Sequence, residues 1–261
     1  MNALSRVLFA IGPAGLGILS IIYGDFAMVW QPVPAWVPLR AVIAYLSGAL
    51  LLGCGVAMLM KRTATLAALV LTIFFFSWLL VLQVPRVVAN PLDEGMWLGF
   101  GETLMLVTGG WIQFATRAAG DGRKWGELAS GDSRLRMGRY LFAVSLPLVG
   151  LSHFVYASGT ASMVPAWLPA HLALAHLTGA GHIAAGVGIL FGILPGLAAT
   201  LEALMISAFI LLLHIPGVIA APGSRLQWTM LFVASTLAGA AWAVAGSMRS
   251  IHHLGQRTHA D

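Results

Sequence analysis

Charged residues are scarce in this chain of 261 residues. Only 9% are Asp, Glu, Lys or Arg, whereas 59% are hydrophobic and the mean hydropathy is +0.89. A soluble globular protein carries far more charge, about a quarter of its residues. Long apolar runs are stable in lipid, where a helix keeps its backbone groups hydrogen-bonded within the segment. The composition therefore predicts an all-α, multi-pass membrane protein whose main partner is the lipid bilayer.

Cysteine occurs once, at Cys54, which excludes an intrachain disulfide and a two-cysteine redox relay. No glycine-rich run ends in Lys-Ser or Lys-Thr, so the sequence has no phosphate-binding loop of that type. The net charge of +5 does not indicate a nucleic-acid partner. The basic residues lie in short segments between the apolar runs instead of along one binding face.

The sequence is duplicated. Val33-Pro-Ala-Trp-Val-Pro38 returns as Val164-Pro-Ala-Trp-Leu-Pro169, and the same shift in residue number carries Trp111 onto Trp242. We call this constant shift the repeat offset. We expect residues 1–116 and 140–248 to form two four-helix repeats. A basic cytoplasmic linker would cover residues 117–139, and a polar cytoplasmic tail residues 249–261.

Eight apolar stretches are long enough, or nearly so, to cross about 30 Å of hydrocarbon at 1.5 Å per residue. They are Val7–Tyr23, Arg40–Met60, Thr63–Val84, Met96–Thr116, Tyr140–Tyr156, His171–Phe191, Gly196–His214 and Trp228–Met248. An even number of spans per copy gives both copies the same orientation, as in a parallel repeat. The expected fold is two parallel four-helix bundles with eight transmembrane helices.

Basic residues predict the orientation. With the N-terminus inside, only Arg40, Arg86 and Arg225 fall outside. The other Lys and Arg residues are cytoplasmic: Arg6, Lys61, Arg62, Arg117, Arg123, Lys124, Arg134, Arg136, Arg139, Arg249 and Arg257. By the positive-inside rule, both termini are predicted to be cytoplasmic.

Several motifs resemble the DoxX-like family of bacterial four-helix membrane proteins. The second copy contains Gly150-Leu-Ser-His153-Phe-Val-Tyr156, Leu177-Thr-Gly-Ala-Gly-His182 and Leu213-His-Ile-Pro216, and the first contains Tyr23-Gly-Asp-Phe26 and Trp30-Gln-Pro-Val-Pro-Ala-Trp36. The resemblance covers nearly all of each copy. It implies a four-helix fold and a bacterial inner-membrane location. Some members of the family are subunits of a thiosulfate:quinone oxidoreductase.

Five histidines distinguish the second copy from the first: His153, His171, His176, His182 and His214. The residues that we align with them in the first copy are Ile21, Arg40, Tyr45, Leu51 and Gln83. At 100° per residue, His171, Thr178 and His182 share one face of their helix. No two histidines have the four-residue spacing that would place both on one metal from a single helix, so a metal or haem site would need ligands from several helices. We therefore assign no metal ligands and do not expect haem.

Two carboxyl groups fall inside predicted spans, Glu202 in the second copy and Glu102 in the first. Ionisable residues within a membrane are expensive and are often functional. This polar set fits four explanations: a structural hydrogen-bond network, a site for the polar head of an apolar ligand, a proton-coupled transport path, or a metal or haem site.

Our leading expectation is a site for a quinone or lipid-like ligand in the second bundle. Its residues would be His153, Tyr156, Trp167, His171, His176, Thr178, His182, Glu202 and His214. No motif for an electron-transfer centre is visible, so a redox role would require a partner subunit. A proton-coupled transporter and a non-catalytic assembly or cargo-binding protein are the alternatives.

Overall fold

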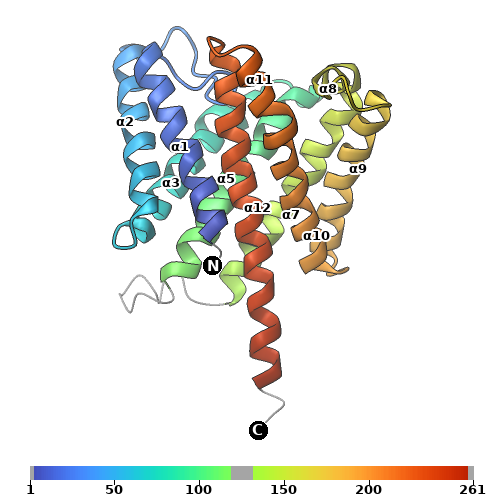
Figure 1. Cartoon of the computed structure of the whole chain (residues 1–261). Coiled ribbons are helices and arrows are strands. Elements are labelled where there is room, and N and C mark those ends of the chain that lie inside the picture. Colours follow the sequence, from blue (N-terminus) through green and yellow to red (C-terminus); the bar gives the residue numbers. More distant parts are fainter. Residues whose placement is uncertain (1–2, 119–131, 258–261) are drawn as a thin grey trace.

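The computed structural model describes residues 3–118 and 132–257, with side chains as far as Met248, and these residues form helices and no strand. Figure 1 shows the long helices side by side, with the N-terminus at the lower end. The helices are α1 (Ala3–Tyr23), α2 (Arg40–Leu59), α3 (Ala64–Trp78), α4 (Val84–Ala89), α5 (Glu94–Ala118), α7 (Asp132–Val155), α8 (Ala157–Met163), α9 (His171–Leu190), α10 (Pro195–Phe209), α11 (Ile215–Ala220) and α12 (Arg225–Arg257). One π-helical turn joins α3 to α4 (η1, Leu79–Gln83) and another joins α10 to α11 (η2, Ile210–His214).

Seven helical segments in the described part of the chain are long and apolar enough to cross a membrane. They are Ala3–Tyr23, Arg40–Leu59, Ala64–Ala89, Asp132–Val155, His171–Leu190, Pro195–Ala220 and Arg225–Met248. The protein is therefore a multi-pass helical membrane protein. The fourth predicted span is also helical, as α5, but it is not one of the seven, because polar residues such as Glu102 and Gln113 interrupt it.

The position of α5 explains its polarity. It lies between α3, α7 and α12, and nearly all of its residues from Gly101 to Ala118 are buried. A helix enclosed by other helices presents little surface to lipid, so it needs less apolar character than a helix at the periphery.

Several helices extend beyond the predicted spans. The helix predicted from Tyr140 begins at Asp132, inside the predicted linker. Its extra turns carry polar side chains that pair with one another: Arg136 Nη2 lies 2.8 Å from Asp132 Oδ2. Such pairs stabilise a helix without apolar contacts, and hydropathy does not detect them. The predicted tail begins as a continuation of α12 through Arg257. Residues 119–131 of the linker, with Arg123 and Lys124, lie outside the described residues, as do residues 258–261 of the tail.

The element boundaries repeat along the chain. The repeat offset carries the start of α2 onto the start of α9, and the start of η1 onto the start of η2. Leu39 and Ala170, directly before α2 and α9, both adopt left-handed backbone conformations, with φ of 53° and 55°. The third predicted span and its counterpart thus share the same π turn and continue to Ala89 and Ala220.

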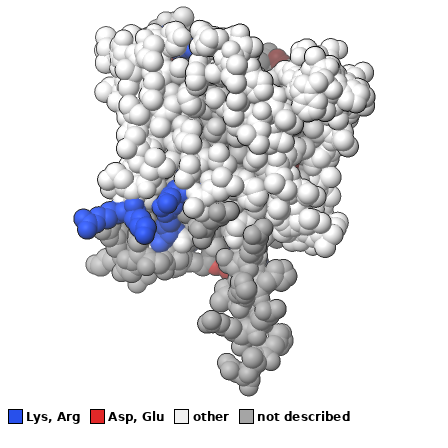
Figure 2. All heavy atoms as spheres, viewed as in Figure 1, with Lys and Arg blue, Asp and Glu red and all other residues white. Residues whose placement is uncertain are grey.

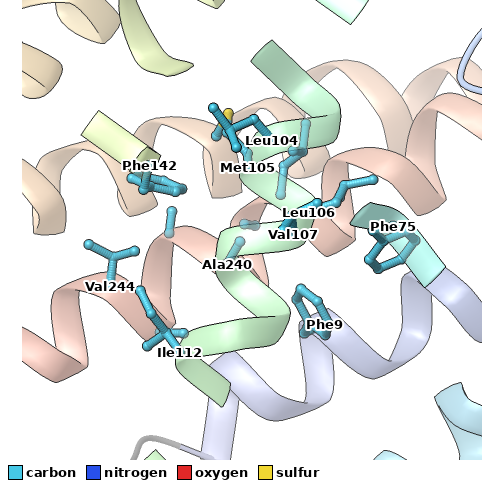
Figure 3. Packing of buried hydrophobic residues seen from close by; sticks show 14 of the residues in the cluster. Phe9, Phe75, Leu104, Met105, Leu106, Val107, Ile112, Phe142, Ala240 and Val244 are labelled. Atoms are coloured by element: carbon cyan, nitrogen blue, oxygen red, sulfur yellow. The ribbon is translucent and has the colours of Figure 1, made fainter. Parts of the chain in front are cut away.

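Helices from the two halves pack across one another. Helix α1 packs along both α2 and α12, and α7 packs along both α9 and α5, while α5 and α12 also meet. Figure 3 shows Phe9 and Phe75 on one side of α5 and Phe142 on the other. These side chains belong to one continuous apolar core, to which Ala240 and Val244 of α12 also contribute. The first half is therefore not a separate bundle, because its helix α1 packs against α12, which belongs to the second half.

The two ends of the molecule differ. The hairpin end holds the tight turns 60–63 and 191–194, and the loop end holds segments 24–39, 90–93, 164–170 and 221–224. Figure 2 shows Lys and Arg gathered near the hairpin end, below a broad band of uncharged surface. Lys61 and Arg62 lie in the first of the hairpin turns.

At the loop end, Asp25 joins three helices of both halves. Its carboxylate pairs with Arg40 at the start of α2, and Arg225 Nη1, at the start of α12, lies 3.5 Å from Asp25 Oδ2. Burial raises the pKa of Asp25, but hydrogen bonds from the Phe26 amide and Arg40, with the charges of both arginines, lower it below its ordinary value of 3.8.

Glu94, the first residue of α5, lies at the position that the repeat offset carries onto Arg225. Unlike Asp25, it has no hydrogen-bond partner for its buried carboxyl oxygens. Burial, together with the neighbouring Asp93 carboxylate, raises the pKa of Glu94 from 4.5 to about 7.

Candidate functional site

A partly open cavity of about 470 Å³ is lined mainly by α7, α9, α10, η2 and α12 of the second half, and on one side by α5 of the first half. Residues of α8 and of segment 164–168 line its loop-end side. Most of the wall is apolar, with Met105, Leu174, Leu212 and Val233 among the lining residues. Its size is within the range of about 300–1,000 Å³ that is usual for small-molecule sites.

His153 faces this cavity from α7. Its Nδ1 lies 3.0 Å from the hydroxyl oxygen of Thr178 on α9. The same hydroxyl lies 3.1 and 2.9 Å from the carbonyl oxygens of Leu174 and Ala175, and with its single hydrogen directed at either of them it accepts from the imidazole. We therefore assign the proton of neutral His153 to Nδ1. This leaves the lone pair of Nε2 for a molecule in the cavity.

His182 is oriented by a carboxyl group behind it. Its Nδ1 lies 2.8 Å from Glu202 Oε1, and both side chains are almost completely buried. Since Nδ1 turns toward Glu202 and the residue lines the cavity, Nε2 is the ring nitrogen available there. Glu202 Oε2 has no hydrogen-bond partner. A carboxyl group that orients an imidazole can hold it in one tautomer and can share its proton.

The two imidazoles form one cluster. Their ring centroids are 5.1 Å apart in an edge-to-face arrangement, and the Phe209 ring stacks on His153 at 6.3 Å. The sequence predicted that His153, His182, Thr178 and Glu202 belong to one site, and the structure brings them together.

His214 also lines the cavity, from η2, and its buried Nδ1 has no hydrogen-bond partner. It precedes Ile215 and Pro216 of α11. Proline lacks an amide hydrogen and interrupts the regular bonding of a helix. The π turn at this point therefore places His214 next to the cavity without breaking the span.

Two further residues of the site come from the first half. Trp30 Nε1 donates to Glu102 Oε2 at 2.6 Å, and both residues line the cavity. Glu102 is near enough to His182 for the two groups to interact electrostatically. The sequence identified Glu102 as an intramembrane carboxyl group but did not assign it to this site. The missing information was the packing of α5 against α7, which the repeat offset does not encode.

The remaining predicted site residues lie away from the cavity wall. The His176 ring stacks on Phe154 with centroids 5.3 Å apart, and His171 is the first residue of α9. Trp167 is 71% exposed, although its neighbours Pro165 and Leu168 line the cavity. Tyr156 is exposed as well, with its hydroxyl beside Gly95 of α5.

The structure corrects one pairing between the copies. A side chain added at Gly179 would meet the Cβ atom of His153, and one added at Gly48 would meet the Cβ atom of Ser20. Ser20, and not Ile21, therefore occupies the place of His153 in the first half. Gly17 and Gly150 approach the same two glycines, and Ser20 and His153 each follow three residues later, so the pairing with Ile21 was one residue too far along the helix.

Within the described residues, no group of three or more His, Cys, Asp or Glu side chains is arranged to hold a metal ion. What the site offers instead is hydrogen bonding and proton exchange inside an apolar cavity. Fold and site together define a multi-pass helical membrane protein with a partly open, largely apolar cavity that carries histidines and a carboxyl group. No family model matches the chain, and comparisons with curated proteins and with solved structures give no significant match.

Proposed function

We propose that this chain is a bacterial inner-membrane protein of DoxX-like type that binds a small, mainly apolar ligand in the cavity of its second half. It crosses the membrane eight times, as two parallel four-helix copies, with both termini in the cytoplasm. The ligand has a polar group that contacts His153 and His182.

The helix boundaries support the duplicated topology. The second and third helical segments of each half coincide at the repeat offset, including their π turns. The buried helix α5 occupies the place in the first half that α12 occupies in the second, and it supplies the eighth span. Since α5 and α12 sit at the centre, the two copies share these helices as a common wall.

Charge supports the orientation. Lys61 and Arg62 lie at the hairpin end, as do the N-terminus and Arg6, whereas the arginines at the loop end are few. Arg40 and Arg225 at that end are paired with Asp25. The hairpin end is therefore the cytoplasmic side under the positive-inside rule.

The observation that carries the ligand-binding proposal is that a neighbouring polar side chain orients each of the two imidazole rings. Each one is held from behind, by Thr178 or by Glu202, so that its other nitrogen serves the cavity. Two histidines fixed in this way around an apolar cavity, His182 buried and His153 half-buried, are typical of a site that orients one polar group of an otherwise apolar molecule. A lipid-like metabolite fits this description, as does a quinone in its reduced form, whose hydroxyl groups can donate to the imidazole nitrogens. With a quinone, the chain would act as an accessory subunit whose redox partner carries the electron-transfer centre.

The test is to identify what the protein retains. Wild-type protein, extracted gently into lipid nanodiscs, would be analysed by mass spectrometry of its organic extract, alongside Ala208→Phe and Ala180→Phe. Ala208 lines the cavity, whereas Ala180 on α9 is exposed to lipid. We expect one compound to be enriched over bulk lipid in the wild type and in Ala180→Phe, and lost in Ala208→Phe. Equal lipid profiles in all three proteins would contradict ligand binding.

A proton-coupled transporter is the second candidate, and the position of Glu202 favours it. Behind His182, Glu202 also borders an open, largely apolar groove of about 410 Å³ between α9 and α10, on the hairpin-end side. A carboxyl group between His182 and this groove can pass a proton from one side to the other. Uptake into proteoliposomes under an imposed proton gradient, abolished by Glu202→Gln, would support transport; saturable binding without flux would exclude it.

A further inference from the structure

The cavity wall carries carboxyl groups but no basic side chain other than histidine. Glu102 lines it directly and Glu202 lies behind His182, while none of the described lining residues is Lys or Arg. A carboxylate in an apolar region needs a partner of opposite charge or a set of donors. The Trp30 indole supplies one donor, to Oε2, so the second oxygen of Glu102 remains for the ligand.

Two hydroxyl groups of the wall, those of Thr178 and Ser152, already donate within their own helices. The Thr178 hydroxyl donates to the carbonyl of Leu174 or Ala175, and the Ser152 hydroxyl donates to the Val149 carbonyl at 2.7 Å. Hydroxyl groups that bond to their own helix have no second hydrogen to offer.

The acceptors, by contrast, are free. Nε2 of neutral His153 presents a lone pair, because its proton is on Nδ1. When Glu202 is ionised, it holds the proton of His182 on Nδ1 in the same way, and His182 Nε2 becomes a second acceptor. With Glu102 Oε1, three acceptors converge on the cavity. A ligand that has several hydrogen-bond donors and a positive charge would satisfy all three acceptors.

We propose that the ligand is a lipophilic amine, whose ammonium group binds Glu102, His153 and His182 while its hydrocarbon part fills the apolar remainder of the cavity. This inference rests on the ligand-binding function proposed above. A primary ammonium has three N–H donors, one for each acceptor. The aromatic faces of Trp30 and Phe209, which also line the cavity, suit a cation. An anionic head group would meet Glu102 with no Lys or Arg side chain among the described lining residues to offset the repulsion.

The test compares amphiphiles with the same chain: dodecylamine, dodecyltrimethylammonium, 1-dodecanol and dodecanoate. Dissociation constants would be measured at pH 7 on the full-length protein in nanodiscs of neutral lipid, with empty nanodiscs subtracted. We expect dodecylamine to bind at least tenfold more tightly than the alcohol and at least 100-fold more tightly than the carboxylate, because charge-assisted hydrogen bonds are about twice as strong as neutral ones. The trimethylammonium compound has no N–H group, so it should bind at least tenfold more weakly than dodecylamine.

Two variants complete the test. Glu102→Gln keeps the shape of the side chain and removes its charge, so the preference for amine over alcohol should fall at least tenfold while the alcohol affinity stays within threefold. Ala180→Phe, on the lipid-facing surface, should leave the whole series unchanged. Equal affinity for amine and carboxylate in the wild type would overturn the amine proposal. Absence of binding by all four probes would instead overturn the ligand-binding function itself.

Discussion

His182 and Glu202 are costly residues to bury in a membrane unless they stay together. The positions that match them in the first half, at the repeat offset, are Leu51 and Leu71, both completely buried. The same scaffold thus holds an apolar pair in one half and an ionisable pair in the other. Removing one partner of a buried ionic pair leaves the other without compensation, and this usually costs more than replacing both.

We predict strong coupling between these two positions. His182→Leu or Glu202→Leu alone should lower the free energy of unfolding by about 3–5 kcal/mol, because each leaves one buried polar group unpaired. The double variant, which copies the first half, should lose at least about 2 kcal/mol less than the sum of the single losses. Chemical unfolding of all four proteins in one detergent gives the cycle, and additive losses would show that the two side chains do not act as a pair.

The sequence predicted His153, His182 and His214 of the cavity wall and Glu202 behind it, because histidines confined to one copy, and a carboxyl group within an apolar helix of that copy, stand out. It did not predict Trp30 and Glu102 as partners of that site. Their position depends on how α5 packs against α7, and this is decided by side-chain fit between helices far apart in the chain. His176 shows the reverse: it has the right residue type, but its place on the helix turns it toward Phe154.

At the scale of the helices, glycines set how closely neighbours approach. A Cβ atom at Gly55 of α2 would lie 2.6 Å from the backbone nitrogen of Ala14 and 2.8 Å from the carbonyl oxygen of Ala10, both on α1. Small residues at such contacts let the backbones of membrane helices pack tightly. Gly53, two residues earlier, has no atom within 4 Å of the same virtual position.

We therefore predict opposite results for two identical substitutions. Gly55→Ala should destabilise the protein by about 1–3 kcal/mol, because backbone atoms cannot move aside as a flexible side chain would. Gly53→Ala should be neutral or stabilising by up to about 1 kcal/mol, since alanine is the better helix former. Thermal unfolding in detergent distinguishes them, and an equal loss in both would mean that α1 and α2 are less closely packed.

The helices themselves were the most predictable feature, since hydropathy alone located the segments that the structure shows as membrane-length helices. The ends of the helices were less predictable. The start of α7 at Asp132 depends on ion pairing within the helix, and the π turns depend on Pro85 and Pro216 inside otherwise continuous spans. Neither feature changes the mean hydropathy of a window.

At the scale of the whole molecule, Asp25 and Glu94 predict opposite responses of stability to pH. The folded-state pKa of Asp25 is lowered, so its contribution is present above the ordinary value of 3.8 and is lost as the pH falls through the folded-state value. The folded-state pKa of Glu94 is raised from 4.5 to about 7, so stability decreases as the pH rises across that interval. Together they predict maximum stability in mildly acidic solution.

Replacing either carboxyl group with its amide should remove the change in stability on one side of this pH maximum. Asp25→Asn should flatten the acidic limb and lower stability by about 1 kcal/mol near neutral pH, a modest value because its ion pairs are partly exposed. Glu94→Gln should flatten the limb between pH 4.5 and 7 and leave the acidic limb unchanged. Unfolding measured from pH 3 to 8 checks both, and a wild-type profile without a maximum would contradict the prediction.

The packing of α1 against α12 has a consequence for how the protein is made. During synthesis, α1 is made well before α12, although Gly239 of α12 lies against the backbone of Phe9 in α1. One face of α1 therefore has no permanent partner until α12 has also been translated. Until then, lipid or an insertion factor must cover that face, so α12 completes the packing of a helix that was made long before it.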